Sequence, residues 1–249
     1  MLYDQARMKG LSLKEDGWKY DAYRQFAMKL SDTAYLFPCI PATIGFRREQ
    51  FRYGFVSDPR TDRAAEEVAG LLGRFGEEAR SCGKYASLVL FFETPAKLAE
   101  SCTVEEYREI FWRLLRKIRS LDEEDWPEHI PADPHNPLWE YCFRKERYFM
   151  YCATPAHRLR LSRHFPYFIL AITPRWVLAD FDANGAAADH MKKKIRERIP
   201  AYDAVGIHPD LNSYGNEDNY EWKQYFLGDD SASSSSRCPF ADSHIKKKN

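Results

Sequence analysis

The chain has 249 residues, of which 37 are Lys or Arg, 37 are Asp or Glu, and 15% are aromatic. Because the formal net charge is zero, we expect neither a nucleic-acid partner nor an acidic membrane partner. A chain of this length can bury a sizeable core, and we expect one globular domain over residues 1–228, followed by a low-complexity tail over 229–249.

Helical segments stand out by their pattern of apolar residues. In the first of them, Trp18, Ala22, Phe26 and Leu30 recur every four positions, which is typical of an amphipathic helix. Another begins with Thr103 and has a glutamate three residues later, the pattern of a capping box. The predicted helices cover residues 17–31, 61–80, 103–121 and 186–199.

Strands are predicted where apolar residues alternate or run continuously. The run YASLVLFFE at 85–93 is apolar throughout and predicts a central strand. The other predicted strands cover residues 51–57, 139–143, 148–153 and 166–173, and residues 219–227 predict either a helix or a strand. Since several strand pairs look like hairpins, we expect an α+β fold: a single domain with a mixed, mainly antiparallel sheet packed by helices.

Two connecting segments carry unusual residues. FPCIPA at 37–42 contains Pro38 and Pro41, which predict a stiff, extended, apolar loop. A short helix is predicted to begin at Thr154, between the last two strands, because threonine caps a helix well and proline suits its first position. A histidine in the first turn of such a helix stays neutral because of the helix dipole, and a neutral imidazole is the form that binds a metal or a haem iron.

The cysteines and the N-terminus indicate in which cellular compartment the protein is expected. Six cysteines lie at positions 39, 82, 102, 142, 152 and 238, with no CxxC pair and no zinc-ligand spacing, which predicts free thiols. The polar N-terminus lacks the apolar stretch of a signal peptide. Since the longest apolar runs are only as long as strands, we expect no membrane span and a cytoplasmic location.

Three segments together resemble the YqcI/YcgG family of bacterial proteins. They are FPCIPA at 37–42, TPAHRLRLSR at 154–163 with PRW at 174–176, and HPDLNSYGNEDNYEWKQYFL at 208–227. The resemblance implies a haem-dependent N-oxygenase (a monooxygenase) that uses haem b and dioxygen, because characterised members hydroxylate a guanidino or amine nitrogen. Arginine-like compounds and a guanitoxin precursor are their substrates. The chain has no flavin or nicotinamide motif, so an external electron donor is expected.

Under this resemblance, four residues are candidates to ligate the iron. We predict His157 as the ligand, although a histidine in this place would otherwise be interpreted as part of a helix cap. His208 and the thiols of Cys39 and Cys238 are the alternatives, and Cys238 is the weaker thiol because it follows a serine run. The simpler interpretations are an ordinary loop histidine for His208 and a small core residue for Cys39.

Other residues are predicted to surround the haem. Arg160, Arg163 and Arg175 would hold the propionates by bidentate hydrogen bonds, unless they form a solvated helix face. Trp176 would wall the haem or the substrate, although buried tryptophan is usually part of a core. His164 would act on the distal side of the haem or hold a propionate.

A cationic substrate needs carboxylates, because a buried and unpaired cation is costly. Glu217, Asp218 and Glu221 lie close together in sequence, and we predict Glu217 and Glu221 as catalytic residues alongside His164. The same acids would also suit the N-terminus of a helix, where the dipole favours negative charge.

Other functions remain open at this stage. One is a non-catalytic haem carrier or sensor. Another is a non-haem iron oxygenase with His157, His208 and Asp210 as ligands. A third is a structural protein without a cofactor. The chain contains no GxGxxG, GxxxxGK[ST], GxSxG or HExxH sequence, which argues against the enzyme classes that use them. A homodimer is a further possibility.

Overall fold

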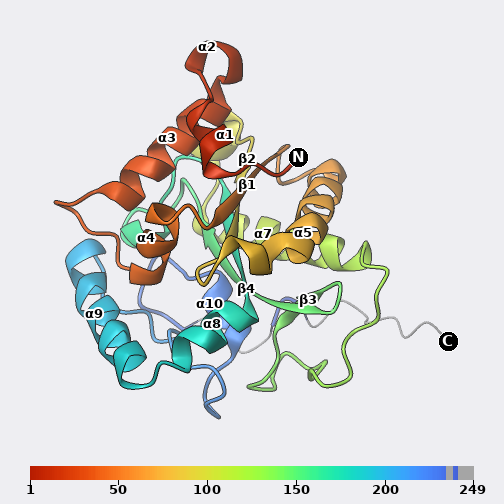
Figure 1. Cartoon of the computed structure of the whole chain (residues 1–249), viewed down its shortest axis with the longest axis vertical. Coiled ribbons are helices and arrows are strands. Elements are labelled where there is room, and N and C mark those ends of the chain that lie inside the picture. Colours follow the sequence, from red (N-terminus) through yellow and green to blue (C-terminus); the bar gives the residue numbers. More distant parts are fainter. Residues whose placement is uncertain (234–237, 241–249) are drawn as a thin grey trace.

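A five-stranded sheet forms the centre of the fold (Figure 1). The strands are β1 (Phe51–Val56), β2 (Ser87–Phe92), β3 (Tyr141–Phe143), β4 (Glu146–Ala153) and β5 (Ile169–Pro174). Their order is β1-β2-β5-β4-β3, with β1 and β2 parallel and the other pairs antiparallel. The predicted α+β fold with a mixed, mainly antiparallel sheet is confirmed. The computed structural model describes residues 1–233 and 238–240.

Helices cover both faces of the sheet, which explains why every residue of β2 is buried. Leu88 and Leu90 point into one core, whereas Val89 and Phe91 point into the other. In Figure 1, α5 and α7 lie on one side of the strands, and α3 and α4 on the other. Within the described part of the chain, every helix is too short or too polar to cross a bilayer.

The first face packs against two long amphipathic helices, α5 (Asp62–Cys82) and α7 (Val104–Ser120), with the short α6 (Ala96–Ser101) between them. The capping box predicted at Thr103 is present, since its hydroxyl accepts from the backbone of Glu106 and the glutamate side chain accepts in return. The segment predicted as helix or strand contains α10 (Glu221–Tyr225), whose aromatic residues join this core.

The predicted tail contributes to the same core. Cys238 and Phe240 lie within residues 229–249, yet they are only 0% and 2% exposed. They pack with Trp139 and Tyr141, whose rings lie 5.6 and 5.7 Å from the ring of Phe240. The rest of the predicted tail, residues 234–237 and 241–249, lies outside the described residues.

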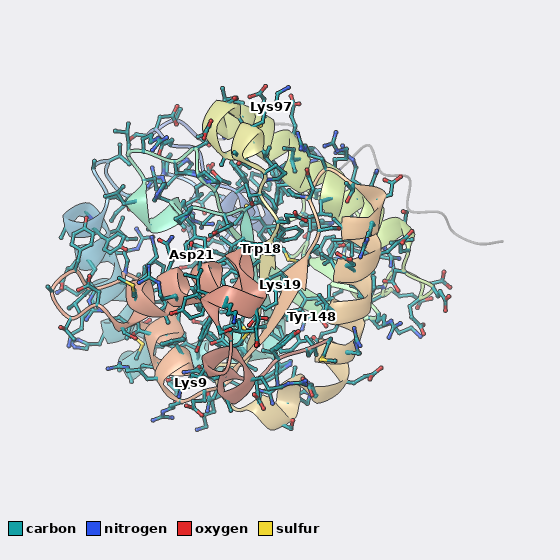
Figure 2. All side chains as sticks on the ribbon, turned by 90° about the horizontal axis from the view of Figure 1, so that it is seen from above. Lys9, Trp18, Lys19, Asp21, Lys97 and Tyr148 are labelled. Carbon is teal, nitrogen blue, oxygen red and sulfur yellow. The ribbon has the colours of Figure 1, made fainter. Side chains whose placement is uncertain are left out.

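The second face is covered by α3 (Trp18–Ser31) and α4 (Ile40–Arg47), preceded by two short helices, α1 (Gln5–Lys9) and α2 (Leu13–Asp16). Trp18, Lys19 and Asp21 mark the start of α3 in Figure 2. Two further helices, α8 (Arg175–Asp182) and α9 (Ala186–Tyr202), follow β5. Phe26 anchors this layer, because its ring makes edge-to-face contacts with Phe46 and Phe91.

The prediction of an extended loop over 37–42 is wrong in its second half. Ile40 begins α4, and Pro41 sits in the first turn, where its missing N–H has no intrahelical partner to lose. Gly45 then lets this helix approach the sheet closely, since a Cβ atom there would lie 2.6 Å from Cε1 of Phe51. The prolines therefore start a helix at this place and do not prevent one.

The helix predicted from Thr154 is also absent. Thr154 instead forms an isolated bridge with His164, and only Leu161–Arg163 form a single 3-10 turn. The hydroxyl of Thr154 accepts from the N–H of Ala156, two residues on, which is a turn and not a helix cap. The carboxylate of Asp229 takes the N–H groups that a helix would have used.

Candidate active site

A cavity of about 180 Å³ lies between the sheet and the α3–α4 layer. Its floor consists of side chains from the three central strands, in rows that the strand register defines. One row is Val89, Ala171 and Tyr151, and Ala153 lies beside Ile169 in the next. Because Ala171 and Ala153 are small, the middle of the floor is hollow. Phe26, Leu30, Pro41 and Ala42 cover it from above.

Cys39 opens onto this cavity from the N-terminal end of α4. Cys39 is exposed to solvent although many protein atoms lie around it, and it is among the residues that line the cavity. Burial raises the pKa of the Cys39 thiol, while a hydrogen bond from the backbone N–H of Ala42 and the positive charge of Arg163 oppose that rise. The thiol is therefore protonated in the unloaded protein, and it would become a thiolate only when a metal ion replaces its proton.

His164 faces the same cavity from the connection between β4 and β5. Its Nδ1 lies 2.8 Å from the carbonyl oxygen of His157, so Nδ1 carries the proton and donates it. The other ring nitrogen, Nε2, therefore holds a lone pair. Burial lowers the pKa of His164, which keeps the ring neutral near pH 7.

Further polar groups lie at the edges of the cavity. The hydroxyls of Ser87 and Thr173 lie 2.7 Å apart on its floor. Lys29, on α3, lines the cavity and donates to the carbonyl oxygens of Leu161 and His164, both at 2.9 Å. Lys29 was missed by our sequence analysis. The available signal was a cation next to Leu30 and three positions after Phe26, on the apolar face of a predicted helix.

His157, the predicted iron ligand, is placed elsewhere. It is 1% exposed, and it is not among the residues that line the cavity. Its Nε2 lies 3.0 Å from the carbonyl oxygen of Leu227, and its Nδ1 lies 2.8 Å from the hydroxyl of Thr154. With both ring nitrogens engaged, His157 holds two chain segments together, and this geometry gives no support to it as a ligand.

Two of the predicted propionate arginines hold the chain together in a similar way. Arg160 donates to the carbonyl oxygens of Gly206, Gly228 and Asp230. Arg163 donates to three other carbonyl oxygens and stacks 4.3 Å from the ring of Tyr151. The guanidinium groups of both arginines therefore donate their hydrogen bonds to the backbone, and neither arginine lines the cavity.

Arg175 and Glu221 belong to a separate buried cluster. Arg175 lies 3.1 Å from Glu221 and 3.3 Å from Glu140, and its guanidinium stacks on the ring of Tyr214 at 3.4 Å. Burial raises the pKa of Glu221 to about 7. This cluster joins α8, α10 and the segment before β3, and none of its members lines the cavity.

The remaining predicted residues also lie away from the cavity. Glu217 is exposed in a turn, and Trp176 packs in the opposite core under the guanidinium of Arg80. His208 accepts from the N–H of Asp210 through Nδ1, so its Nε2 carries the proton and does not suit a metal ligand. No group of three or more His, Cys, Asp or Glu in residues 1–233 and 238–240 is arranged to hold a metal ion. Among the predicted site residues, Cys39 and His164 line the cavity, whereas Arg175 and Glu221 pair with each other elsewhere.

Comparison with known proteins places the chain in a family. The sequence profile of the YqcI/YcgG family matches residues 26–241, a range that contains Cys39, His164 and the whole sheet. The chain belongs to the YqcI/YcgG family. The resemblance noted in the sequence is therefore confirmed over most of the chain.

Three known proteins are similar to this chain along most of its length. The uncharacterized proteins YcgG and YqcI of Bacillus subtilis (strain 168) are each 46% identical, over 96% of this chain and 94% of their own lengths. The putative N(omega)-hydroxy-L-arginine synthase DcsA of Streptomyces lavendulae is 30% identical, over 90% of this chain and 84% of its own length. No solved structure matches the chain significantly.

Proposed function

We propose that this member of the YqcI/YcgG family is a haem-dependent oxygenase that hydroxylates a nitrogen of a small guanidino or amine compound. The observation that carries the proposal is the cavity shared by a helix-terminal thiol, Cys39, and a neutral imidazole, His164. The name of the Streptomyces lavendulae relative, an N(omega)-hydroxy-L-arginine synthase, supports the reaction class.

The residues of the cavity suit a haem in their chemistry. The walls are mostly apolar, and Cys39 would ligate the iron through Sγ, with the N–H of Ala42 steadying the thiolate. The cavity volume of about 180 Å³ is close to that of a cavity of about 150 Å³ that holds a single benzene. A porphyrin therefore requires residues 32–39 and α4 to move away from the sheet. We propose that they do so when the cofactor enters.

When bound, a thiolate-ligated haem supplies the reductive activation of dioxygen. The overall reaction turns one N–H of the substrate into N–OH, and the second oxygen atom leaves as water after two electrons and two protons are added. His164 has a lone pair on Nε2, so it can accept a hydrogen bond from the substrate nitrogen and orient it. The electrons come from an external donor, and a cytoplasmic location and a homodimer remain predictions.

The decisive experiment is an absorption spectrum followed by a product assay. Purified protein reconstituted with haem should show a Soret band, and with reductant, dioxygen and L-arginine it should give a product one oxygen atom heavier. A Soret band without product from any guanidino or amine compound would favour a carrier or sensor. Colourless protein with bound iron would favour a non-haem oxygenase, and colourless protein without iron would rule out both.

A further inference from the structure

Lys29 is the cation of the cavity. Its ammonium group donates to two backbone carbonyl oxygens, those of Leu161 and His164. An ammonium has three hydrogens, so one remains for another acceptor. The rings of Phe37 and Tyr202 lie 5.6 and 5.4 Å from Nζ and add only a weak cation–π attraction.

Among the residues that the structure describes, no carboxylate lies within salt-bridge distance of Lys29. Asp203 is the acid that acts on it, and both of its oxygens are already used. One accepts from the N–H of Ser162 at 2.6 Å, and the other accepts from the hydroxyl of Ser162 and lies 3.5 Å from Arg160. Burial lowers the pKa of Lys29 to about 8, and at pH 7 most molecules still carry the charge.

The cavity that Lys29 faces supplies no acid of its own. Its described lining residues include no Asp or Glu, and most of them are apolar. A buried cation without a counter-ion is costly, so the site is suited to a ligand that brings a negative charge. In addition to burial, the positive charge of Lys29 lowers the pKa of His164, whose side chain lines the same cavity.

We infer that the cavity binds a carboxylate at Lys29, with the apolar part of the same ligand over Ala171 and Ala153. Where this carboxylate comes from depends on the proposed function, on which the inference rests in this respect. It is either a propionate of the haem or the carboxylate of an amino-acid substrate, and the recognition chemistry is the same for both.

The first test compares haem with its dimethyl ester, which lacks both carboxylates. Binding is followed by absorbance titration of the wild type, Lys29→Met and Lys29→Arg. If a propionate meets Lys29, the wild type should bind haem about tenfold more tightly than the ester, as one charge-assisted hydrogen bond allows. Lys29→Met should abolish this ratio, whereas Lys29→Arg should keep it.

The second test uses haem-loaded protein with L-arginine and its carboxamide. If the substrate carboxylate meets Lys29, the wild type should prefer L-arginine about tenfold, and Lys29→Met should lose this preference while the haem ratio stays unchanged. The matched control is Lys19→Met, since Lys19 lies on the same helix (Figure 2). Its ammonium group lies over the ring of Phe55, and Lys19 is not among the residues that line the cavity. It should change neither ratio.

A third probe separates this inference from the proposed function. If the protein takes up no haem, calorimetry of the unloaded protein with 4-phenylbutyrate and 4-phenylbutyramide still tests the site. Preference for the carboxylate that disappears in Lys29→Met supports the inference even then. Lys29→Gln replaces Lys29→Met if thermal melting shows that the latter is unfolded. The inference would be overturned if the wild type and the uncharged variant at position 29 showed the same preference for the carboxylate over its uncharged analogue with all three ligand pairs.

Discussion

The Nδ1 atom of His164 lies 2.8 Å from the carbonyl oxygen of His157, so the backbone of one histidine sets the tautomer of the other. His164 lines the cavity and keeps a lone pair on Nε2, whereas both ring nitrogens of His157 are hydrogen-bonded within the protein. The two histidines should therefore respond differently to replacement by glutamine.

We expect His164→Gln to lower turnover at least tenfold while changing the free energy of unfolding by less than about 1 kcal/mol. His157→Gln should instead cost about 1 to 3 kcal/mol of stability, because a buried hydrogen-bonded group is disturbed, with the spectrum of the bound haem unchanged. A product assay measures turnover, urea denaturation measures stability, and the Soret band reports the bound haem. If the His157→Gln variant is folded but shows no Soret band, then His157 is the iron ligand.

The buried imidazole of His157 also predicts a dependence of stability on pH. Burial lowers the pKa of His157 to about 4, below the unfolded value of about 6.5. The unfolded chain therefore takes up a proton first, and the stability that is complete above pH 6.5 should fall towards pH 4. The loss amounts to roughly 3 kcal/mol at most for this residue.

Denaturation curves between pH 4 and pH 7.5 check this. The free energy of unfolding should depend less on pH in His157→Gln than in the wild type. The wild-type dependence should persist in His190→Gln, because His190 is exposed on α9. An equal slope in the wild type and in His157→Gln would show that other groups govern the loss at low pH.

Cys39 should determine the spectrum of the bound haem. A thiolate ligand gives the ferrous carbon monoxide complex a red-shifted Soret band, and Cys39→Ala should lose that shift because the ligand is gone. Cys102→Ala is the matched control, since Cys102 is half-buried at the end of α6, away from the cavity. If Cys39→Ala keeps the wild-type spectrum in every oxidation state, the ligand is another residue, and His164 is the first to test.

The sheet and the long helices followed from the sequence because their signals are local. The apolar run of β2 and the Thr103 capping box depend on residues within a few positions of one another. The segment after Thr154 differs, because the acceptor of its N–H groups is Asp229, between 69 and 71 residues away. Local pattern favoured a helix there, and a distant carboxylate decided otherwise.

The cavity could not be predicted for a related reason. Its hollow depends on the register that sets Ala171 beside Val89 and Tyr151, and a single sequence gives no strand register. Cys39 and His164 were both among the predicted residues, but their shared cavity appears only when α4 lies across the sheet. His157, Arg160 and Arg163 were predicted as haem contacts from their residue type, but each of them binds backbone carbonyl oxygens.

Asp229 should be a strong contributor to stability. Its carboxylate accepts from the backbone N–H groups of Arg158, Leu159 and Arg160 at 2.7 to 3.1 Å. Asp229→Ala leaves these donors without their charged acceptor, and we expect a loss of about 2 to 3 kcal/mol. Asp125→Ala removes an exposed carboxylate from an irregular segment and should stay within about 0.5 kcal/mol. Equal midpoints of urea denaturation for both variants would contradict the role given to Asp229.

A larger side chain at position 171 should impair haem binding without destabilising the fold. Ala171→Leu directs a larger apolar side chain into existing empty space, so the free energy of unfolding should change by less than about 1.5 kcal/mol. The same side chain occupies the floor where a ligand would lie, and haem uptake should fall at least tenfold. Ala183→Leu adds equal bulk at the exposed end of α8 and should leave uptake unchanged. Wild-type haem affinity in Ala171→Leu would mean that the cofactor binds outside this cavity, because a leucine there leaves no room for a ring against the sheet.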